Sequence, residues 1–180
     1  TTLANYCYNG MFSDCTSLTT APELPATTLA DRCYGSMFYH CTSLATTPEL
    51  PATTLANWCY YYMFNGCTSL TTAPELPATT LADACYFGMF QYCANLTTVP
   101  LLPASVLATS CYNTMFWYCT NLNYIKCLAT NISANYCTIN WVIGVQTNSG
   151  TFVKHPDMQS WTTGDNGIPT NWTVEDAVIE

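Results

Sequence analysis

The sequence predicts an α/β solenoid of about five 26-residue repeats, each a helix plus a short strand, with a parallel sheet and a C-terminal cap. The first observation is a 26-residue period with copies at residues 1–26, 27–52, 53–78, 79–104 and 105–129, the first three of which share the pattern TTLA-xx-CY-xx-MF-xx-CTSL-xTxPELPA. The second is a hydrophobic content of 49% in 180 residues, which is enough for a buried core. Repeats of about this length form units that bury their apolar faces by stacking.

The first half of each repeat is expected to be a helix. Its apolar residues recur at spacings of three and four, the periodicity of a helix with one buried face. In the second copy these residues are Leu29, Ala30, Cys33, Tyr34, Met37 and Phe38. Thr27 or Thr28 supplies the N-cap. Further along, the stretch from Leu44 to Thr47 has β character and ends at Pro48, because proline cannot donate to a sheet ladder.

The copies disagree chiefly at positions 5, 6, 9, 10, 13 and 14 of the repeat. At about 100° per residue, these positions occupy one half of the expected helix, and the constant Cys, Tyr, Met and Phe occupy the other half. The varied half is therefore expected to face water. Its large or charged members are the candidate ligand-binding residues, namely Tyr6, Arg32, Tyr39, His40, Trp58, Tyr61, Tyr62, Phe87, Tyr92, Trp117 and Tyr118.

The thirty varied positions hold six Tyr, two Trp, one Phe, five Asn, four Gly and three Ser, and neither Lys nor Glu. A solvated helix face would use Glu, Lys, Gln, Arg and Ala. A bias toward Tyr, Ser, Gly and Asn is typical of antibody paratopes. The alternatives are drift over a tolerant face and packing against another part of a parent protein. Targeted diversification of Asn codons is a further hypothesis, which Trp58, Trp117 and Gln91 do not fit.

The core motif resembles a known group of repeats. The run from Met37-Phe38 through Cys41 to Leu44 is similar to the BspA-like leucine-rich repeats of surface proteins from gut and oral bacteria. This resemblance covers about residues 1 to 129. It implies a curved solenoid, display on a surface and adhesive or host-binding roles, and it brings no common catalytic residues. The segments around Trp141, Gly150 and Trp172 look like the closing part of such proteins.

Ten of the twelve cysteines form two series, at repeat positions 7 and 15. The first series is not expected to form disulfides, because neighbouring helices lie about 8 to 10 Å apart and a disulfide needs Cα atoms within about 7 Å. The second series has suitable spacing but leaves one cysteine unpaired, so buried thiol ladders are favoured over disulfides. The spacing of Cys and His fits no zinc site. No metal ligand is therefore assigned.

A row of carboxylates recurs between two prolines at Glu23, Glu49 and Glu75. Leu101 and Cys127 occupy the same place in the last two copies, so a solvated turn is favoured over a Ca²⁺ site.

Several classes of function are excluded by what the sequence lacks. With three basic side chains against eleven carboxylates, no basic patch is available to bind nucleic acid. No run of about 18 apolar residues predicts a membrane span, and no signal peptide is recognisable. His40 and His155 have no nucleophile or carboxylate at a catalytic spacing. We therefore expect neither an enzyme nor a cofactor.

The two ends of the repeat array need separate treatment. Residues 130–180 break the period and are expected to cap the array, with a last helix from Ile132 to Val145 and a strand from Gly150 to Lys154. At the other end, Thr1 coincides with the start of a repeat. This coincidence suggests a segment of a longer protein.

The sequence as a whole favours a non-enzymatic recognition or adhesion module. Its expected partner is a protein or glycan on a host or bacterial surface, bound through the varied face. Such a module belongs on a cell surface, in secretion or on a virion, in a bacterial or phage setting. The alternative is a structural stalk or spacer whose aromatic face packs against neighbouring subunits.

Overall fold

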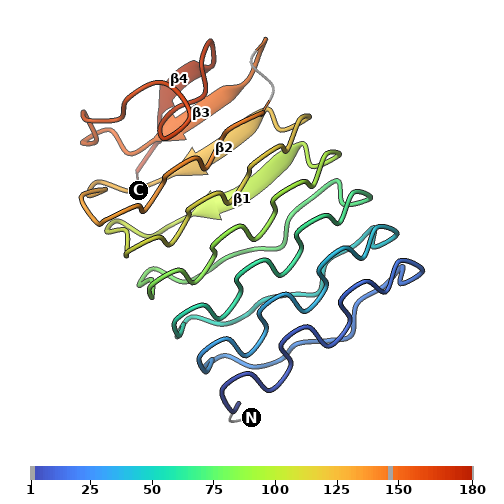
Figure 1. The fold of residues 1–180 in the computed structure, drawn as a ribbon. Helices are drawn as coiled ribbons and strands as arrows, with labels where there is room; N and C mark the ends of the chain where they lie inside the picture. The colour runs from blue at the N-terminus through green and yellow to red at the C-terminus, as the bar shows by residue number, and fades with distance from the viewer. Residues whose placement is uncertain (1–2, 146–147, 180) are drawn as a thin grey trace.

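The structure, a computed structural model, describes residues 3–145 and 148–179. The chain climbs as a stack of flattened coils, each with a zigzag layer and a smoother layer (Figure 1). No helix occurs among the described residues. The predicted helix-plus-strand α/β solenoid is therefore wrong, and with it the assignment to a leucine-rich-repeat solenoid. The expected repeat start at Thr1 lies outside the described residues.

The segments expected to be helices are runs of consecutive β-turns. In the second repeat, the N–H groups of Cys33, Gly35 and Met37 each donate to the carbonyl three residues earlier, at 3.2 to 3.3 Å. A residue with positive φ recurs every fourth position, at Arg32, Ser36 and His40. We call this run, at residues 4–15 and its equivalents up to 134–145, the turn ribbon.

The alternate N–H groups bond outside their own segment. Those of Arg32, Tyr34 and Ser36 donate to carbonyls of the next repeat, at 2.7 to 3.0 Å. Five such bonds join every pair of neighbouring turn ribbons, always with the earlier repeat as donor. We call this arrangement the turn ladder. It satisfies the backbone as a parallel sheet would, although the chain is not extended.

The repeat pattern fits this conformation better than a helix. In CY-xx-MF-xx-C, inward and outward pairs alternate with a period of four, and a short segment cannot distinguish this from 3.6. Positive φ costs an ordinary residue about 1 to 2 kcal/mol. Gly, Asn and Ser, which weaken a helix, suit a chain that turns back every four residues. The ladder bonds offset the strain at Trp58 and Tyr62, where bulky residues adopt positive φ.

The core consists of continuous columns of identical side chains. Rings of Tyr8, Tyr34, Tyr60, Tyr86 and Tyr112 stack at centroid distances of 5.6 to 6.0 Å. A second column, Phe12, Phe38, Phe64, Phe90 and Phe116, stacks at 5.6 to 6.1 Å. Methionines and cysteines fill the remaining interior, and Met63, Cys59 and Cys67 are fully buried. Each column links a repeat to both neighbours.

The second layer forms a regular sheet only toward the C-terminus. Its parallel strands β1 (Thr98–Leu102), β2 (Tyr124–Cys127), β3 (Thr151–Lys154) and β4 (Thr173–Asp176) lie in the order β1-β2-β3-β4. Earlier repeats contribute isolated bridges such as Thr20↔Thr46, so the strand expected from Leu44 to Thr47 does not form. The prolines of each Pro-Glu-Leu-Pro turn interrupt pairing there.

The C-terminal segment continues the stack before closing it. Residues 134–145 add one more turn ribbon, so the helix expected from Ile132 to Val145 is wrong. The donors of this last ribbon meet a following loop, where Asn166 Oδ1 accepts from the Asn140 N–H at 2.6 Å. The Asp165 carbonyl accepts from the Val142 N–H at 3.3 Å. Residues 165–167 thus supply acceptors where a further repeat would otherwise stand.

Candidate recognition face

All eleven candidate residues lie on the outward side of the turn ladder. Four of them, Tyr6, His40, Tyr92 and Tyr118, are exposed, and the other seven are partly buried. The expectation that all thirty varied positions face water is wrong for seven of them: Gly35, Asn65, Gly66, Ala84, Gly88, Gln91 and Thr114 are buried. Hydrogen bonding holds neighbouring ribbons closer than packed helices would lie, so outward side chains cover one another.

The third and fourth repeats carry the densest group of aromatic rings. Trp58 packs edge-on against Tyr61 at 5.9 Å and tilted against Phe87 at 5.4 Å. Tyr62 packs edge-on against both Tyr61 and Phe87, at 5.9 and 5.3 Å. These four residues form the central aromatic cluster. A second group lies in the fourth and fifth repeats, where Tyr92 stacks on Trp117 and Tyr118.

Arg32 lies among the aromatic rings rather than beside an acid. Its guanidinium carbon is 5.6, 5.2 and 5.7 Å from the ring centroids of Tyr6, Trp58 and Tyr61. Asn9 Nδ2 donates to both the Arg32 carbonyl and the Tyr61 hydroxyl, at 3.3 and 2.9 Å. Ion pairs in the described part of the chain involve Lys154 and the two histidines, not Arg32. The guanidinium donors therefore remain available to an acceptor from outside.

Glycines on this face make room for rings of adjacent repeats. A Cβ added to Gly35 would overlap the ring of Tyr61, which stands at the same position one repeat later. A Cβ on Gly88 would overlap Tyr62, and one on Gly66 would overlap His40. At these three places, a glycine thus makes room for a large residue at the same position of an adjacent repeat. The bias toward Gly on the varied face therefore reflects ring packing between repeats, and the aligned copies carry the signal for this complementarity.

Replacing Gly35 tests this complementarity directly, because its φ is not in the left-handed region. We expect Gly35→Ala to destabilise the protein by about 1 to 3 kcal/mol, the usual cost of overpacking. Tyr61→Ala should relieve most of that cost in the double variant, since the overlapping ring is removed. Urea unfolding of the wild type, both single variants and the double variant measures the coupling. Additive effects would show that Tyr61 does not occupy the space above Gly35.

Position 5 of the repeat has a backbone role. Oδ1 of Asn5, Asp31, Asn57 and Asp83 each accepts the N–H of the residue 26 positions later, at 3.1 to 3.2 Å. Asn and Asp alternate, which keeps like charges from adjacent steps of the column. The sequence places these residues on the varied face, but the variation among these four is limited to side chains that can accept this bond.

All twelve cysteines lie in the described residues and all are free thiols. The helix-spacing argument against disulfides at position 7 is wrong, because neighbouring ribbons lie at hydrogen-bonding distance. At position 15, Cys67 Sγ donates to the Phe38 carbonyl at 3.1 Å, and Cys41, Cys93 and Cys119 make the equivalent bond. Burial raises the pKa of Cys33 to about 11 and that of Cys67 to about 12. These thiols are structural and poorly reactive.

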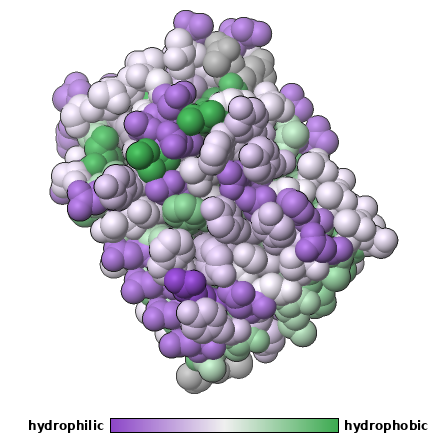
Figure 2. Space-filling view, in the orientation of Figure 1, coloured by the Kyte–Doolittle hydropathy of each residue, from purple (hydrophilic) through white to green (hydrophobic). Residues whose placement is uncertain are grey.

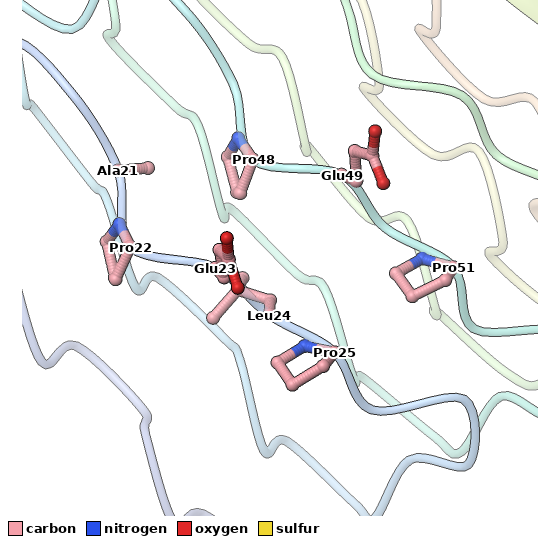
Figure 3. Close-up of a pocket in the computed structure, with 8 residues that line it drawn as sticks. All are labelled: Ala21, Pro22, Glu23, Leu24, Pro25, Pro48, Glu49 and Pro51. Atoms are coloured by element: carbon pink, nitrogen blue, oxygen red, sulfur yellow. The ribbon is translucent and has the colours of Figure 1, made fainter.

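A shallow groove of about 410 Å³ lies between successive Pro-Glu-Leu-Pro turns (Figure 3). Pro22, Pro25, Pro48 and Pro51 line it, and Glu23 and Glu49 are exposed at its edge. Among the described residues, no group of three or more His, Cys, Asp or Glu side chains is placed to hold a metal ion. The carboxylates that line the groove, those of Glu23 and Glu49, are both exposed.

Comparison with known proteins returns no matching family model, no similar curated protein and no similar solved structure. The site alone therefore indicates what the protein does. The described part of the chain contains no helix long and apolar enough to span a membrane. On the face seen in Figure 2, most residues are pale or hydrophilic in colour, with strongly hydrophobic colour confined to small patches.

Proposed function

We propose that this protein is a non-enzymatic recognition module that binds a protein or glycan partner through the outward side of the turn ladder. The observation that carries the proposal is Arg32 with the central aromatic cluster: a half-buried guanidinium held against three rings, with no carboxylate partner among the described residues. Trp, Tyr and Arg are the residues that dominate binding energy at interfaces. Such a module acts on a cell surface, in secretion or on a virion.

The rigidity of this face supports a binding role. The rings contact one another, Tyr61 lies over Gly35, and Asn9 fixes its hydroxyl. Side chains that are already ordered lose little conformational entropy when a partner arrives, so more of the contact energy contributes to affinity.

A triple variant, Trp58→Ala with Tyr61→Ala and Tyr62→Ala, tests the proposal. We expect loss of binding on glycan arrays and on surface-protein panels, with the protein still folded by circular dichroism. The matched control replaces the exposed Thr46, Thr72 and Thr98 on the other layer by Ala, and it should bind as the wild type does. Binding by the aromatic triple variant at the level of the threonine control would contradict the proposal.

The same triple variant addresses the alternative role of a stalk or spacer. If the aromatic face packs against neighbouring subunits, the wild type should assemble in sedimentation experiments and the variant should not. If the face recognises a separate ligand, the mass in solution should be unchanged while binding is lost.

A further inference from the structure

The first turn ribbon presents a row of carbonyl groups without donors. In later repeats the carbonyls at positions 5, 7, 9, 11 and 13 accept the ladder bonds, as those of Asp31, Cys33 and Gly35 do. The equivalents in the first repeat are the carbonyls of Asn5, Cys7, Asn9, Met11 and Ser13. No donor among residues 3–145 and 148–179 reaches any of these five. We call this row the acceptor edge.

The side-chain packing along the acceptor edge is also incomplete, because side chains that are buried in later repeats are exposed here. Met11 is 58% exposed and Tyr8 is 38% exposed, whereas Met37 and Tyr34 are each 2% exposed in the next repeat. A hollow of about 260 Å³ opens beside Leu3, Tyr8 and Met11. Cys7 and Cys15 are the two exposed cysteines. In each of the four later copies, the position-15 thiol donates to a carbonyl of the preceding repeat, as Cys41 does to Phe12 at 3.0 Å.

We propose that the acceptor edge is a docking surface for a polypeptide segment of the same repeat type, in the turn conformation, with its donor side uncovered. Such a segment presents an N–H group at every second residue, which matches the five carbonyls. Its own Tyr, Met and Phe would extend the ring columns over Tyr8, Met11 and Phe12. The six existing ribbons show this pairing five times in one register.

A folded second copy of this chain does not fit the acceptor edge. Two acceptor edges facing each other would place carbonyl oxygens against carbonyl oxygens, which is repulsive. On the donor side of the last ribbon, the N–H groups of Asn140 and Val142 already donate to Asn166 and Asp165, so this side does not offer a full row of uncovered donors. The matching partner is therefore a repeat-type segment whose donor side is uncovered.

The test joins an additional copy of residues 53–78 in register ahead of Thr1 and measures alkylation of each cysteine by mass spectrometry. We expect Cys7 and Cys15 to react at least about tenfold more slowly than in the chain alone, because docking buries both thiols. The matched control carries the same copy with Tyr60→Pro and Phe64→Pro within it, which removes two donor N–H groups. There Cys7 and Cys15 should stay reactive.

Equal labelling of Cys7 and Cys15 with the intact and the proline-containing copy would overturn the proposal. The proposal would also be overturned if Cys7 and Cys15 became protected in the unfused chain at high protein concentration and the chain had a dimeric mass. That result would mean that two copies of the chain pair with each other. Labelling of Cys33 and Cys41 reports whether the stack beneath stays folded. If Cys33 and Cys41 become reactive in either fusion, the copy is instead added to the intact chain as a separate peptide. The proposal then requires that the intact peptide, and not the proline-containing one, protects Cys7 and Cys15.

Discussion

Raising the pH above about 9 is expected to unfold the protein cooperatively. Burial raises the pKa of ten cysteines above the ordinary value of 9.0, among them Cys41 to about 11 and Cys127 to about 12. Burial raises the pKa of core tyrosines as well, and that of Tyr34 rises to about 12. The columns thus concentrate many groups that ionise more easily once the chain unfolds.

The direction of the effect follows from proton linkage. Between pH 9 and the raised values, the unfolded chain has lost its thiol protons while the folded chain keeps them, so stability is complete below pH 9 and falls above it. Each thiol lowers the unfolding free energy by about 1.4 kcal/mol per pH unit in that range. A domain is typically stable by about 5 to 15 kcal/mol. Because all ten thiols act in the same direction, the free energy of unfolding should fall steeply above pH 9.

Urea unfolding from pH 7 to 11 under reducing conditions measures this slope. The control is the double variant Cys67→Ser with Cys93→Ser, in which the hydroxyls keep the hydrogen bonds to the Phe38 and Phe64 carbonyls but do not ionise. Its free energy should fall less steeply with pH than that of the wild type. A flat profile up to pH 11 would contradict the assignment of these thiols to the core.

Replacing Trp141 is expected to cause the largest loss of stability from a single side chain. Trp141 is fully buried and takes the place of methionine in the last turn ribbon. Its ring stacks on Tyr112 at 6.2 Å and on Trp161 at 5.6 Å, and its Nε1–H donates to the Gly167 carbonyl at 2.7 Å. It therefore joins the ring columns to the loop that closes them.

Trp141→Ala should cost about 3 to 5 kcal/mol, as for other buried large-to-alanine changes. Trp141→Phe keeps a ring but loses the hydrogen bond, and should cost about 1 to 2 kcal/mol. Trp117→Ala is the control, since Trp117 is partly exposed and its Nε1 has no partner among the described residues. Chemical denaturation compares the three variants. An equal loss for Trp141→Ala and Trp117→Ala would mean that Trp141 does not close the stack.

The buried face of each repeat is predictable from the sequence, but its conformation is not. Cys33, Tyr34, Met37 and Phe38 form a constant set, and all four are buried. Spacings of three and four within so short a segment suit a helix and a four-residue turn period equally. The discriminating signal is Gly35-Ser36 between two apolar pairs, where a helix would favour Ala, Glu or Lys.

The outward placement of the candidate residues was predictable from the sequence, but their contacts were not. Every candidate residue lies outward, yet ring packing and burial depend on the distance between ribbons, which the helix hypothesis overstates. Asn57, a varied position outside the candidate set, shows another contact that depends on this distance, because its Oδ1 accepts from the Asp83 N–H. Any diversification of this face must also keep Gly35 and Gly88 small, or change their overlying rings together with them.

The uniform direction of the ladder bonds gives the molecule an electrostatic axis. Peptide groups that donate to the next repeat all point the same way, and each peptide carries a dipole of about 3.5 D. Their sum leaves the first repeat relatively negative and the last relatively positive, as the aligned peptides of a helix do for its two ends. Two such stacks lying side by side would attract when they run in opposite directions and repel when they run in the same direction.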